Sequence, residues 1–371
     1  MKILIVPDSF KGSATSTEVA RAIQKGVNAA WPDARITLRP LADGGEGSLE
    51  VLHHVLQGDW INVDTVDPLG RSLTARYLRV DECAYIELAE ASGLQLLATE
   101  ERDGAKTTTV GTGRLIRHAV DQGCSLVFLF VGGSATNDAG TGLATALGYR
   151  FLDSEEQEFV PTGATLAKIE RIIVPEEGPS VTYQVLCDVS NLFTGQNGAT
   201  FIYGPQKGII PKSLSQVEEG MEHLRKKILG LKGVDLNMLP GSGAAGGTAG
   251  GMVAFFGATV QSGIDFIADR LHLQDAIKGA DLVITGEGKL DDQTLSGKAI
   301  GGVVKLAADL DKPVIAICGQ LGLSGSVIQE MGLGAAFSVQ RGIRPLREAM
   351  VHTMEDLEEC SRQIIHVFRM S

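Results

Sequence analysis

Three stretches of the sequence place acids, small hydroxyl residues and lysines directly after short apolar runs. They are PDSFKGS (residues 7–13), GGSATND (132–138) and TGEGKLDD (285–292). Successive backbone N–H groups in a glycine-rich turn can hold an anion, and a nearby lysine can neutralise it. Carboxylates in such loops suit Mg²⁺, which binds through one or two carboxylates plus substrate phosphates. Phosphoryl transfer needs this combination of groups, because it depends on positioning and charge neutralisation.

Three loops also have a simpler interpretation, in which they only begin a helix or reverse the chain. In PDSFKGS, Ser13 or Thr15 can cap the next helix, and in LADGGEG (residues 41–47) Asp43 can do the same. In GGSATND the simple alternative is a turn that reverses the chain. We favour ligand binding for all three, because carboxylates and donors recur at successive predicted strand ends.

Further loops carry single chemical groups. CDVSN (residues 187–191) places Asp188 after an apolar run, and FIYGPQKG (201–208) presents Lys207. PGSGAAGG (240–247) contains GxGxxG, but it follows NMLP and not a strand, so we interpret it as a glycine-rich helix entry. GxxxxGK[ST], HExxH and GxSxG do not occur, and the 7 histidines are scattered. From the residues alone, the prediction is a Mg²⁺-dependent small-molecule kinase.

The elements that position these loops follow from hydrophobic periodicity. Short apolar runs alternate with amphipathic segments near both ends of the chain, which indicates βα units and a mainly parallel sheet. The middle is richer in β-structure, and the DPLG turn (residues 67–70) separates two of its strands. We predict helices over 15–30 and 46–56. The predicted strands are 3–6, 36–41, 60–66, 73–80, 84–88, 126–131, 183–187, 282–285, 314–318 and 335–339.

Because the two ends resemble each other and the middle differs, the sequence predicts two domains. One is a discontinuous α/β domain of about 1–58 with 265–371, and the other is an inserted mixed α/β domain of about 59–264. We expect the active site in the cleft between them, where ligand sites commonly form.

Composition excludes several classes of function. The formal net charge of −12 argues against a nucleic-acid-binding surface. No apolar run approaches the ~20 residues of a membrane span, and the first apolar run is too short for a signal peptide. The 5 cysteines include no CxxC pair, which indicates reduced thiols in a cytoplasmic protein. We expect no nucleic-acid or membrane partner, and the sequence leaves monomer and homodimer open.

The motifs together resemble a known family. PDSFKGS, LADGGEG, DPLG, IELAEASGL, VGGSATND, CDVSN, YGPQKG, GSGAAGG and TGEGKLDDQT follow, in order, the pattern of the bacterial glycerate kinases found beside glucarate and glyoxylate-pathway genes. The resemblance covers nearly the whole chain. It implies a flavodoxin-like, doubly wound parallel-sheet domain interrupted by the inserted domain.

The resemblance also implies a reaction, in which the γ-phosphate of ATP is transferred to D-glycerate with Mg²⁺ present. Enteric members make 2-phosphoglycerate, so we expect phosphorylation at the 2-hydroxyl. The alternatives are 3-phosphoglycerate as product or another small hydroxy acid as substrate. Ile300 stands where the family commonly has proline, which could alter the loop after Lys298. A nucleotide-dependent oxidoreductase is the alternative from another class, and GSGAAGG and the parallel sheet are its only support.

From the motifs and the family resemblance, we assign a role to each candidate site residue. Asp188 is the first choice for the base, because it ends a strand of the inserted domain. The sequence leaves open which of Asp8, Asp43, Asp188 and Asp291 is the base and which binds metal. We predict catalytic roles for Asp188, Lys11 and Asp8; nucleotide or phosphate binding by Gly132, Gly133, Ser134, Thr136, Asn137, Gly286, Gly288 and Lys289; substrate binding by Ser9, Asp43, Gly44, Gly45, Lys207 and Asn191; and metal binding by Asp291 and Asp138.

Overall fold

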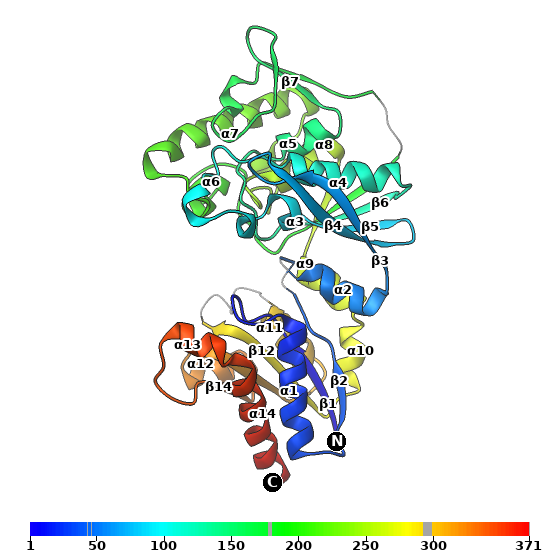
Figure 1. Cartoon of the computed structure of the whole chain (residues 1–371), viewed down its shortest axis with the longest axis vertical. Coiled ribbons are helices and arrows are strands. Elements are labelled where there is room, and N and C mark those ends of the chain that lie inside the picture. Colours follow the sequence, from blue (N-terminus) through cyan, green and yellow to red (C-terminus); the bar gives the residue numbers. More distant parts are fainter. Residues whose placement is uncertain (43, 46, 177–179, 292–298, 371) are drawn as a thin grey trace. The chain divides into compact units, whose positions relative to one another are not determined.

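The computed structural model describes residues 1–42, 44–45, 47–176, 180–291 and 299–370. The chain forms two compact units (Figure 1). Unit 1 comprises Met1–Asp43, Glu50–Val55 and Ile264–Ser371, and unit 2 comprises Gly44–Leu49 and Leu56–Gly263. The predicted division placed residues 44–49 and 56–58 with the first domain, whereas here they belong to unit 2. The predicted site residue Asp43 lies outside the described residues, as do Glu46 and residues 292–298.

Unit 1 is built on a five-stranded sheet in the order β14-β13-β12-β1-β2, and all neighbouring strands are parallel. Because the strands run in one direction, their carboxyl ends meet at one edge of the sheet. The strands are β1 (Lys2–Pro7), β2 (Arg35–Leu38), β12 (Leu282–Leu290), β13 (Val314–Leu321) and β14 (Ala335–Ser338).

Helices bury apolar residues against this sheet. Helix α1 (Ser16–Ala30) and helix α14 (Thr353–Met370) pack against each other, and their apolar residues share a core with β1, β12 and β13 (Figure 1). Gly26 permits this approach, since a Cβ there would lie 2.1 Å from the Glu358 carbonyl oxygen. The other helices that lie wholly or partly in this unit are α2 (Ser48–Leu56), α9 (Gly263–Arg270), α10 (Leu273–Lys278), α11 (Ala299–Ala308), α12 (Gly325–Glu330) and α13 (Leu346–Val351).

Two strands of this sheet are longer than the sequence predicted. The predicted strand 282–285 continues to Leu290, and the predicted strand 314–318 continues to Leu321. Pairing persists because glycine removes the steric barrier: a Cβ on Gly286 would lie 2.2 Å from the Ile317 carbonyl oxygen, and one on Gly319 would lie 2.6 Å from the Gly288 carbonyl oxygen. Residues 286–290, which the sequence predicted as a loop, therefore belong to the strand.

Unit 2 contains a six-stranded mixed sheet in the order β11-β10-β6-β5-β4-β3. β3 and β4 form an antiparallel hairpin, β4 and β5 are also antiparallel, and β5, β6, β10 and β11 are parallel. The three strands predicted at 60–66, 73–80 and 84–88 are thus paired antiparallel. The strands are β3 (Asp59–Val66), β4 (Ser72–Val80), β5 (Cys83–Glu87), β6 (Leu126–Phe130), β10 (Thr182–Leu186) and β11 (Thr259–Gln261).

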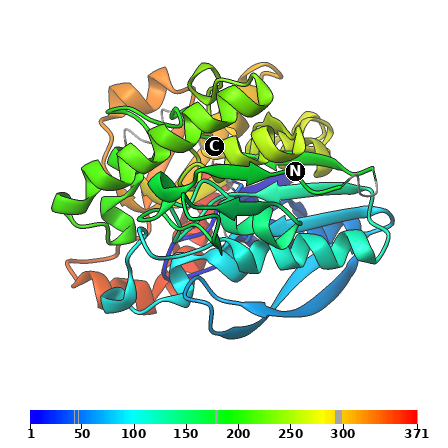
Figure 2. The same ribbon diagram turned by 90° about the horizontal axis from the view of Figure 1, so that it is seen from above.

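Helices α4 (Val110–Asp121) and α8 (Thr248–Phe256) contribute apolar side chains to the core of this sheet, and α4 lies alongside the strands in Figure 2. A second core gathers around α7 (Pro211–Lys232). The remaining elements are helices α3 (Ala89–Ser92), α5 (Thr141–Ala146) and α6 (Ala199–Tyr203); a small antiparallel sheet of β7 (Arg150–Leu152), β8 (Glu158–Phe159) and β9 (Arg171–Ile173); and 3₁₀ turns at Leu94–Leu96, Thr99–Glu101, Leu166–Lys168, Pro205–Lys207 and Leu236–Met238.

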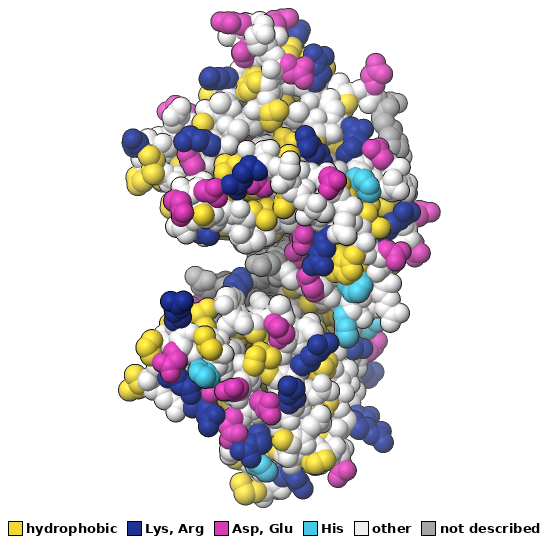
Figure 3. All heavy atoms as spheres, viewed as in Figure 1, with side chains coloured by type: hydrophobic (Ala, Val, Ile, Leu, Met, Phe, Trp, Pro, Cys, Tyr) yellow, Lys and Arg dark blue, Asp and Glu magenta, His cyan; other side chains and the backbone are white. Residues whose placement is uncertain are grey.

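The surface carries charges of both signs. On the face drawn in Figure 3, basic and acidic side chains are interspersed, and no extended basic patch is visible among the described residues. The formal net charge of the whole chain is −12. Within the described part of the chain, none of the helices has the length and apolar character needed to cross a bilayer.

Candidate active site

A cavity of about 370 Å³ opens in unit 1 at the carboxyl ends of β1, β12 and β13. In an open parallel sheet this edge is where ligands bind. The loop after β1 and the end of β12 line it together, although they lie far apart in the sequence. Six predicted site residues line this cavity: Asp8, Ser9, Lys11, Gly288, Lys289 and Asp291.

Residues 8–13, in the loop after β1, do not cap helix α1. Thr15 caps α1 through a capping box, in which its hydroxyl accepts from the Glu18 N–H and the Glu18 carboxylate accepts from the Thr15 N–H at 2.8 Å. Asp8 is buried at the sheet edge, where its N–H donates to the Gly286 carbonyl oxygen and its Oδ1 accepts from the Ser9 N–H at 2.6 Å. Lys11 is exposed on the same loop. The predicted capping role is therefore correct for Thr15, while Asp8 lies at the cavity.

The end of β12 supplies a lysine and two carboxylates. Lys289 Nζ lies 2.9 Å from Asp291 Oδ2, and the Lys289 side chain is 57% exposed. Glu287 also lines the cavity and is buried, yet the sequence argument gave it no role. Burial, together with the charge of Glu287, raises the pKa of the Cys318 thiol to about 12. Cys318 is therefore protonated at neutral pH and unsuited to nucleophilic chemistry.

The carboxylates that line the cavity suit a Mg²⁺ ion that is also bound by substrate oxygens. Asp8, Glu287 and Asp291 all line the cavity, and carboxylate oxygens are the ligands that Mg²⁺ prefers. The described residues contain no cluster of three or more His, Cys, Asp or Glu with the geometry of a metal site. A magnesium ion here would therefore be held by one or two carboxylates together with substrate oxygens, as is usual in kinases.

In unit 2, a second group of predicted residues meets at the carboxyl end of β10. Asp188 is exposed, and its Oδ1 accepts from the Ser262 hydroxyl at 2.8 Å. A Cβ on Gly44 would lie 3.0 Å from Asp188 Oδ2, and a Cβ on Gly132 would lie 2.4 Å from the Gly45 Cα. Glycine at these positions thus lets residues 44–45 approach Asp188 on one side and Gly132 on the other.

The stretch 132–138 is accessible only at its beginning. Gly132 is partly exposed, and Gly133 is exposed and adopts a left-handed φ of +72°. Among the described residues, none accepts a hydrogen bond from the backbone N–H of Gly132 or Gly133. Ser134, Thr136 and Asn137 are buried. The two glycines could therefore donate to an anion, whereas Thr136 and Asn137 lie inside the unit.

Asp138 lies in the interior of the unit. Its Oδ2 accepts from the N–H and hydroxyl of Thr109, each at 2.8 Å, and from the Gly142 N–H at 3.3 Å, while its Oδ1 accepts from the Gly140 N–H at 3.1 Å. Burial raises the pKa of Asp138, and these four donors oppose that effect. A carboxylate with four donors and no exposure ties two chain segments together. The geometry favours this structural role over the metal role predicted from the sequence.

Lys207 and Asn191, both predicted to bind substrate, are engaged inside unit 2. Lys207 is buried, and its Nζ donates to the Thr136 carbonyl oxygen at 2.7 Å. Burial lowers the pKa of Lys207 to about 7, although the charge of Asp138 opposes the shift. Asn191 donates to the Asn197 carbonyl oxygen and accepts from the Tyr203 hydroxyl at 2.6 Å. Both side chains hold loops in place.

The glycine-rich stretch 240–247 packs behind the 132–138 loop. A Cβ on Gly243 would lie 2.1 Å from the Leu192 carbonyl oxygen, and a Cβ on Gly246 would lie 2.1 Å from the Thr136 carbonyl oxygen. Its residues 241–247 are buried. These glycines therefore serve close packing of the chain, which supports the interpretation that GxGxxG is not a dinucleotide site here.

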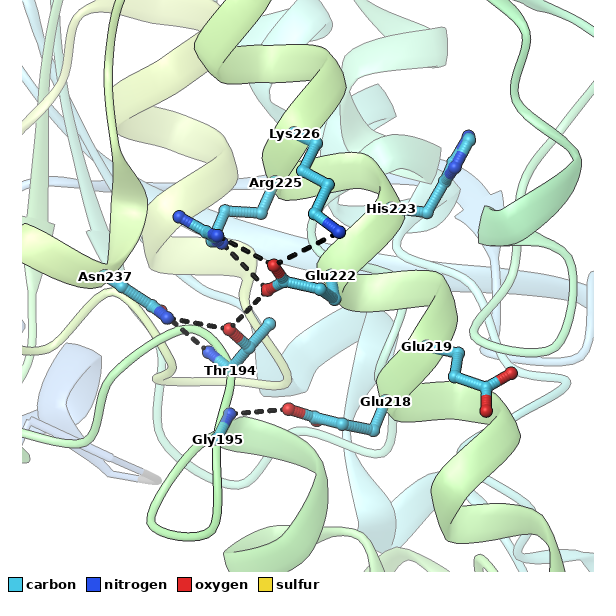
Figure 4. A pocket seen from close by; sticks show the side chains of 9 residues that line it. All are labelled: Thr194, Gly195, Glu218, Glu219, Glu222, His223, Arg225, Lys226 and Asn237. Atoms are coloured by element: carbon cyan, nitrogen blue, oxygen red, sulfur yellow. Dashed lines mark hydrogen bonds and ion pairs between the residues drawn. The ribbon is translucent and has the colours of Figure 1, made fainter.

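Unit 2 also has a wider surface cavity of about 570 Å³ (Figure 4). Several of its polar groups are hydrogen-bonded: Glu222 accepts from Thr194 and Arg225, and Glu218 accepts from the Gly195 N–H at 2.5 Å. His223 points away from this cluster, and its Nε2 lies 2.7 Å from the Ile169 carbonyl oxygen. None of the predicted site residues lines this cavity, so we do not regard it as the candidate active site.

The chain is similar to known proteins over nearly its whole length. Residues 3–369 match the model of the glycerate kinase family. The chain is 41% identical to a glycerate kinase of Halalkalibacterium halodurans (98% of this chain, 97% of the relative) and 39% identical to the glycerate 2-kinase of Escherichia coli (98% and 97%). A crystal structure from Salmonella typhimurium LT2, described as a candidate glycerate kinase 2, superposes with a TM-score of 0.85 at 38% identity, covering 100% of this chain and 98% of that one.

Proposed function

Since the chain belongs to the glycerate kinase family, we propose that it transfers the γ-phosphate of ATP to D-glycerate. The proposed products are 2-phosphoglycerate and ADP, in line with the relative that is named a glycerate 2-kinase. The observation that carries the proposal is that the loop after β1, predicted to hold the catalytic Asp8 and Lys11, and the end of β12, predicted to bind nucleotide or phosphate, line a single cavity. That cavity offers lysines for phosphate charge and carboxylates for a metal ion.

Each group has a task in this reaction. Lys11 and Lys289 neutralise phosphate charge as it develops, because ammonium groups stabilise the transferring phosphoryl oxygens. Asp8 and Asp291 are the groups that would hold Mg²⁺, and the bound metal would neutralise further phosphate charge. In unit 2, Gly132 and Gly133 can donate to an anionic group through their backbone N–H groups. Asp188 is the proposed acceptor of the glycerate hydroxyl proton.

The proposal includes an architecture. Unit 1 is proposed to be a flavodoxin-like domain, and the order β2-β1-β12-β13-β14 supports this because flavodoxin-like sheets run 2-1-3-4-5. Unit 2 is proposed to be the inserted domain, since its main part, residues 56–263, is continuous between two segments of unit 1. Both units are proposed to supply groups to one reaction. A cytoplasmic location stays a prediction.

The test is a coupled assay of ADP release with purified protein, run across a panel of small hydroxy acids. We expect release that requires both D-glycerate and Mg²⁺, and loss of activity with EDTA. Phosphorus NMR of the product distinguishes 2-phosphoglycerate from 3-phosphoglycerate. A 3-phospho product would overturn the proposed position of transfer only. ADP release with another hydroxy acid and none with glycerate would overturn the substrate.

A further inference from the structure

The cavity of unit 1 has a second wall, to which the proposed function assigns no role. Three apolar residues of α13 line it, namely Leu346, Ala349 and Met350. This wall could not be expected from the sequence, because residues 346–350 lie more than 300 positions from Lys11 and carry no motif. The cavity is thus polar where β1 and β12 end and apolar where α13 passes.

This apolar wall directly adjoins the lysine loop. Gly12, which follows Lys11, has a φ of +81°, and a Cβ there would lie only 2.8 Å from the Met350 Cε. The wall is also held in place. Thr353 donates from its hydroxyl to the Met350 carbonyl oxygen at 3.0 Å, and Arg344 Nη1 lies 2.9 Å from Asp356 Oδ2. A ligand in the cavity would therefore meet the lysine loop and the apolar wall together.

We infer that α13 forms the binding wall for the purine ring of the nucleotide, with Lys11 and Lys289 on the side of its phosphates. This inference rests on the proposed function, which makes ATP the co-substrate. A purine has flat apolar faces that match Leu346 and Met350, and the methionine sulfur interacts favourably with aromatic rings. Gln320 and Gln340 also line the cavity, and an amide can both donate to and accept from the polar edge of a purine.

Glycerate does not account for this wall. It is a three-carbon acid whose carboxylate and two hydroxyls cover most of its surface, so it has little apolar area to place against three apolar side chains. Its affinity would come from charge and hydrogen bonds. The apolar wall next to a lysine loop instead matches a ligand with one aromatic end and one polyanionic end.

Helix α13 offers a matched pair of variants. Leu346 lines the cavity and is 72% exposed, while Val351 does not line it and is 76% exposed on the same helix. We compare Leu346→Asn with Val351→Asn, since neither change adds charge near the phosphates. The probes are ADP, which carries the base, and inorganic tripolyphosphate, which does not. Binding of both is measured by calorimetry, and KM is measured separately for ATP and for glycerate.

We expect Leu346→Asn to weaken ADP binding and raise KM for ATP about tenfold, the loss anticipated for removing one apolar contact with the base. Tripolyphosphate binding and KM for glycerate should be unchanged, and Val351→Asn should change neither nucleotide value. Equal ADP affinity in both variants, equal weakening of tripolyphosphate, or no ADP binding by the parent protein would overturn the inference. A parent protein that binds ADP without phosphorylating glycerate would refute the proposed function alone, and the ADP comparison would still decide the purine site.

Discussion

At the scale of single residues, the lysines of the two units differ in what they can contact. Lys11 is exposed beside a cavity, so its ammonium can reach a ligand. Lys207 is buried and donates to a backbone carbonyl oxygen. Both occur in glycine-containing loops, and sequence alone could not separate them. Their burial gives each a different testable role.

Replacing Lys11 by Ala should lower kcat/KM roughly 10²-fold or more, because a charge that stabilises the transferring phosphoryl group is removed. Steady-state kinetics with ATP and glycerate measure the effect. Lys25, an exposed lysine of α1 outside the cavity, provides the control, and Lys25→Ala should keep full activity. Full activity in Lys11→Ala would make Lys11 an ordinary surface residue.

Lys207 should make stability depend on pH. Its folded-state pKa of about 7 lies below its unfolded value near ~10.4. Between these values the unfolded chain binds a proton that the folded chain lacks, so stability rises with pH. From pH 7 to pH 9 the free energy of unfolding should therefore rise in the parent protein relative to Lys207→Met, by on the order of 2 kcal/mol.

Urea denaturation of both proteins at the two pH values measures this difference. The nearby charged group is Asp138, whose carboxylate favours the protonated lysine. Identical pH dependence in the two proteins would contradict the prediction, and it would mean that the pair with Asp138 keeps Lys207 charged throughout.

At the scale of elements, replacing a glycine of unit 2 by alanine should raise or lower stability, depending on what surrounds the glycine. Gly246 has a φ of +65° and faces the Thr136 carbonyl oxygen, so Gly246→Ala should destabilise the protein by more than about 2 kcal/mol. Gly230 lies within α7, and a Cβ added there would have no neighbouring atom within 4 Å, so Gly230→Ala should stabilise by ~0.5–1 kcal/mol. Thermal unfolding of the two variants measures both effects. An unchanged unfolding temperature in Gly246→Ala would show that the loop containing Thr136 can move aside at little energetic cost.

Most strands of the five-stranded and six-stranded sheets could be predicted from apolar runs, because a strand buried on both faces is apolar along its length. The short strand β11 (Thr259–Gln261) has no such run and could not. The extension of β12 over Gly286 and Gly288 could not, since those glycines indicate a loop unless the neighbouring backbone is known. The same limit applies to the site. The motifs identified Asp8 and Lys11, but burial of Asp138 and Lys207 depends on packing between distant segments. The apolar wall of α13 carries no motif, so only the fold reveals it.

At the scale of the whole molecule, the predicted residues divide between the two units. Unit 1 carries Asp8, Lys11, Lys289 and Asp291, while unit 2 carries Asp188 with the glycines around it. Phosphoryl transfer requires both a group that receives the proton and groups that neutralise phosphate charge. If the proposed roles are correct, neither unit is sufficient for catalysis, and groups of both act on the same transition state.

A double-mutant cycle between Lys11→Ala and Asp188→Asn tests this cooperation. Asp188→Asn is nearly isosteric and removes only the charge, so it should lose most of kcat while ADP binding and unfolding temperature stay close to the parent values. Groups that act on one transition state lose their effects together, so the double variant should retain far more activity than the product of the two single losses predicts. Single-turnover rates of the four proteins measure the coupling. Strictly multiplicative losses of activity would mean that the two residues act independently. Normal turnover by Asp188→Asn would mean that another carboxylate is the base. Asp8→Asn and Asp291→Asn would then be the next variants to examine.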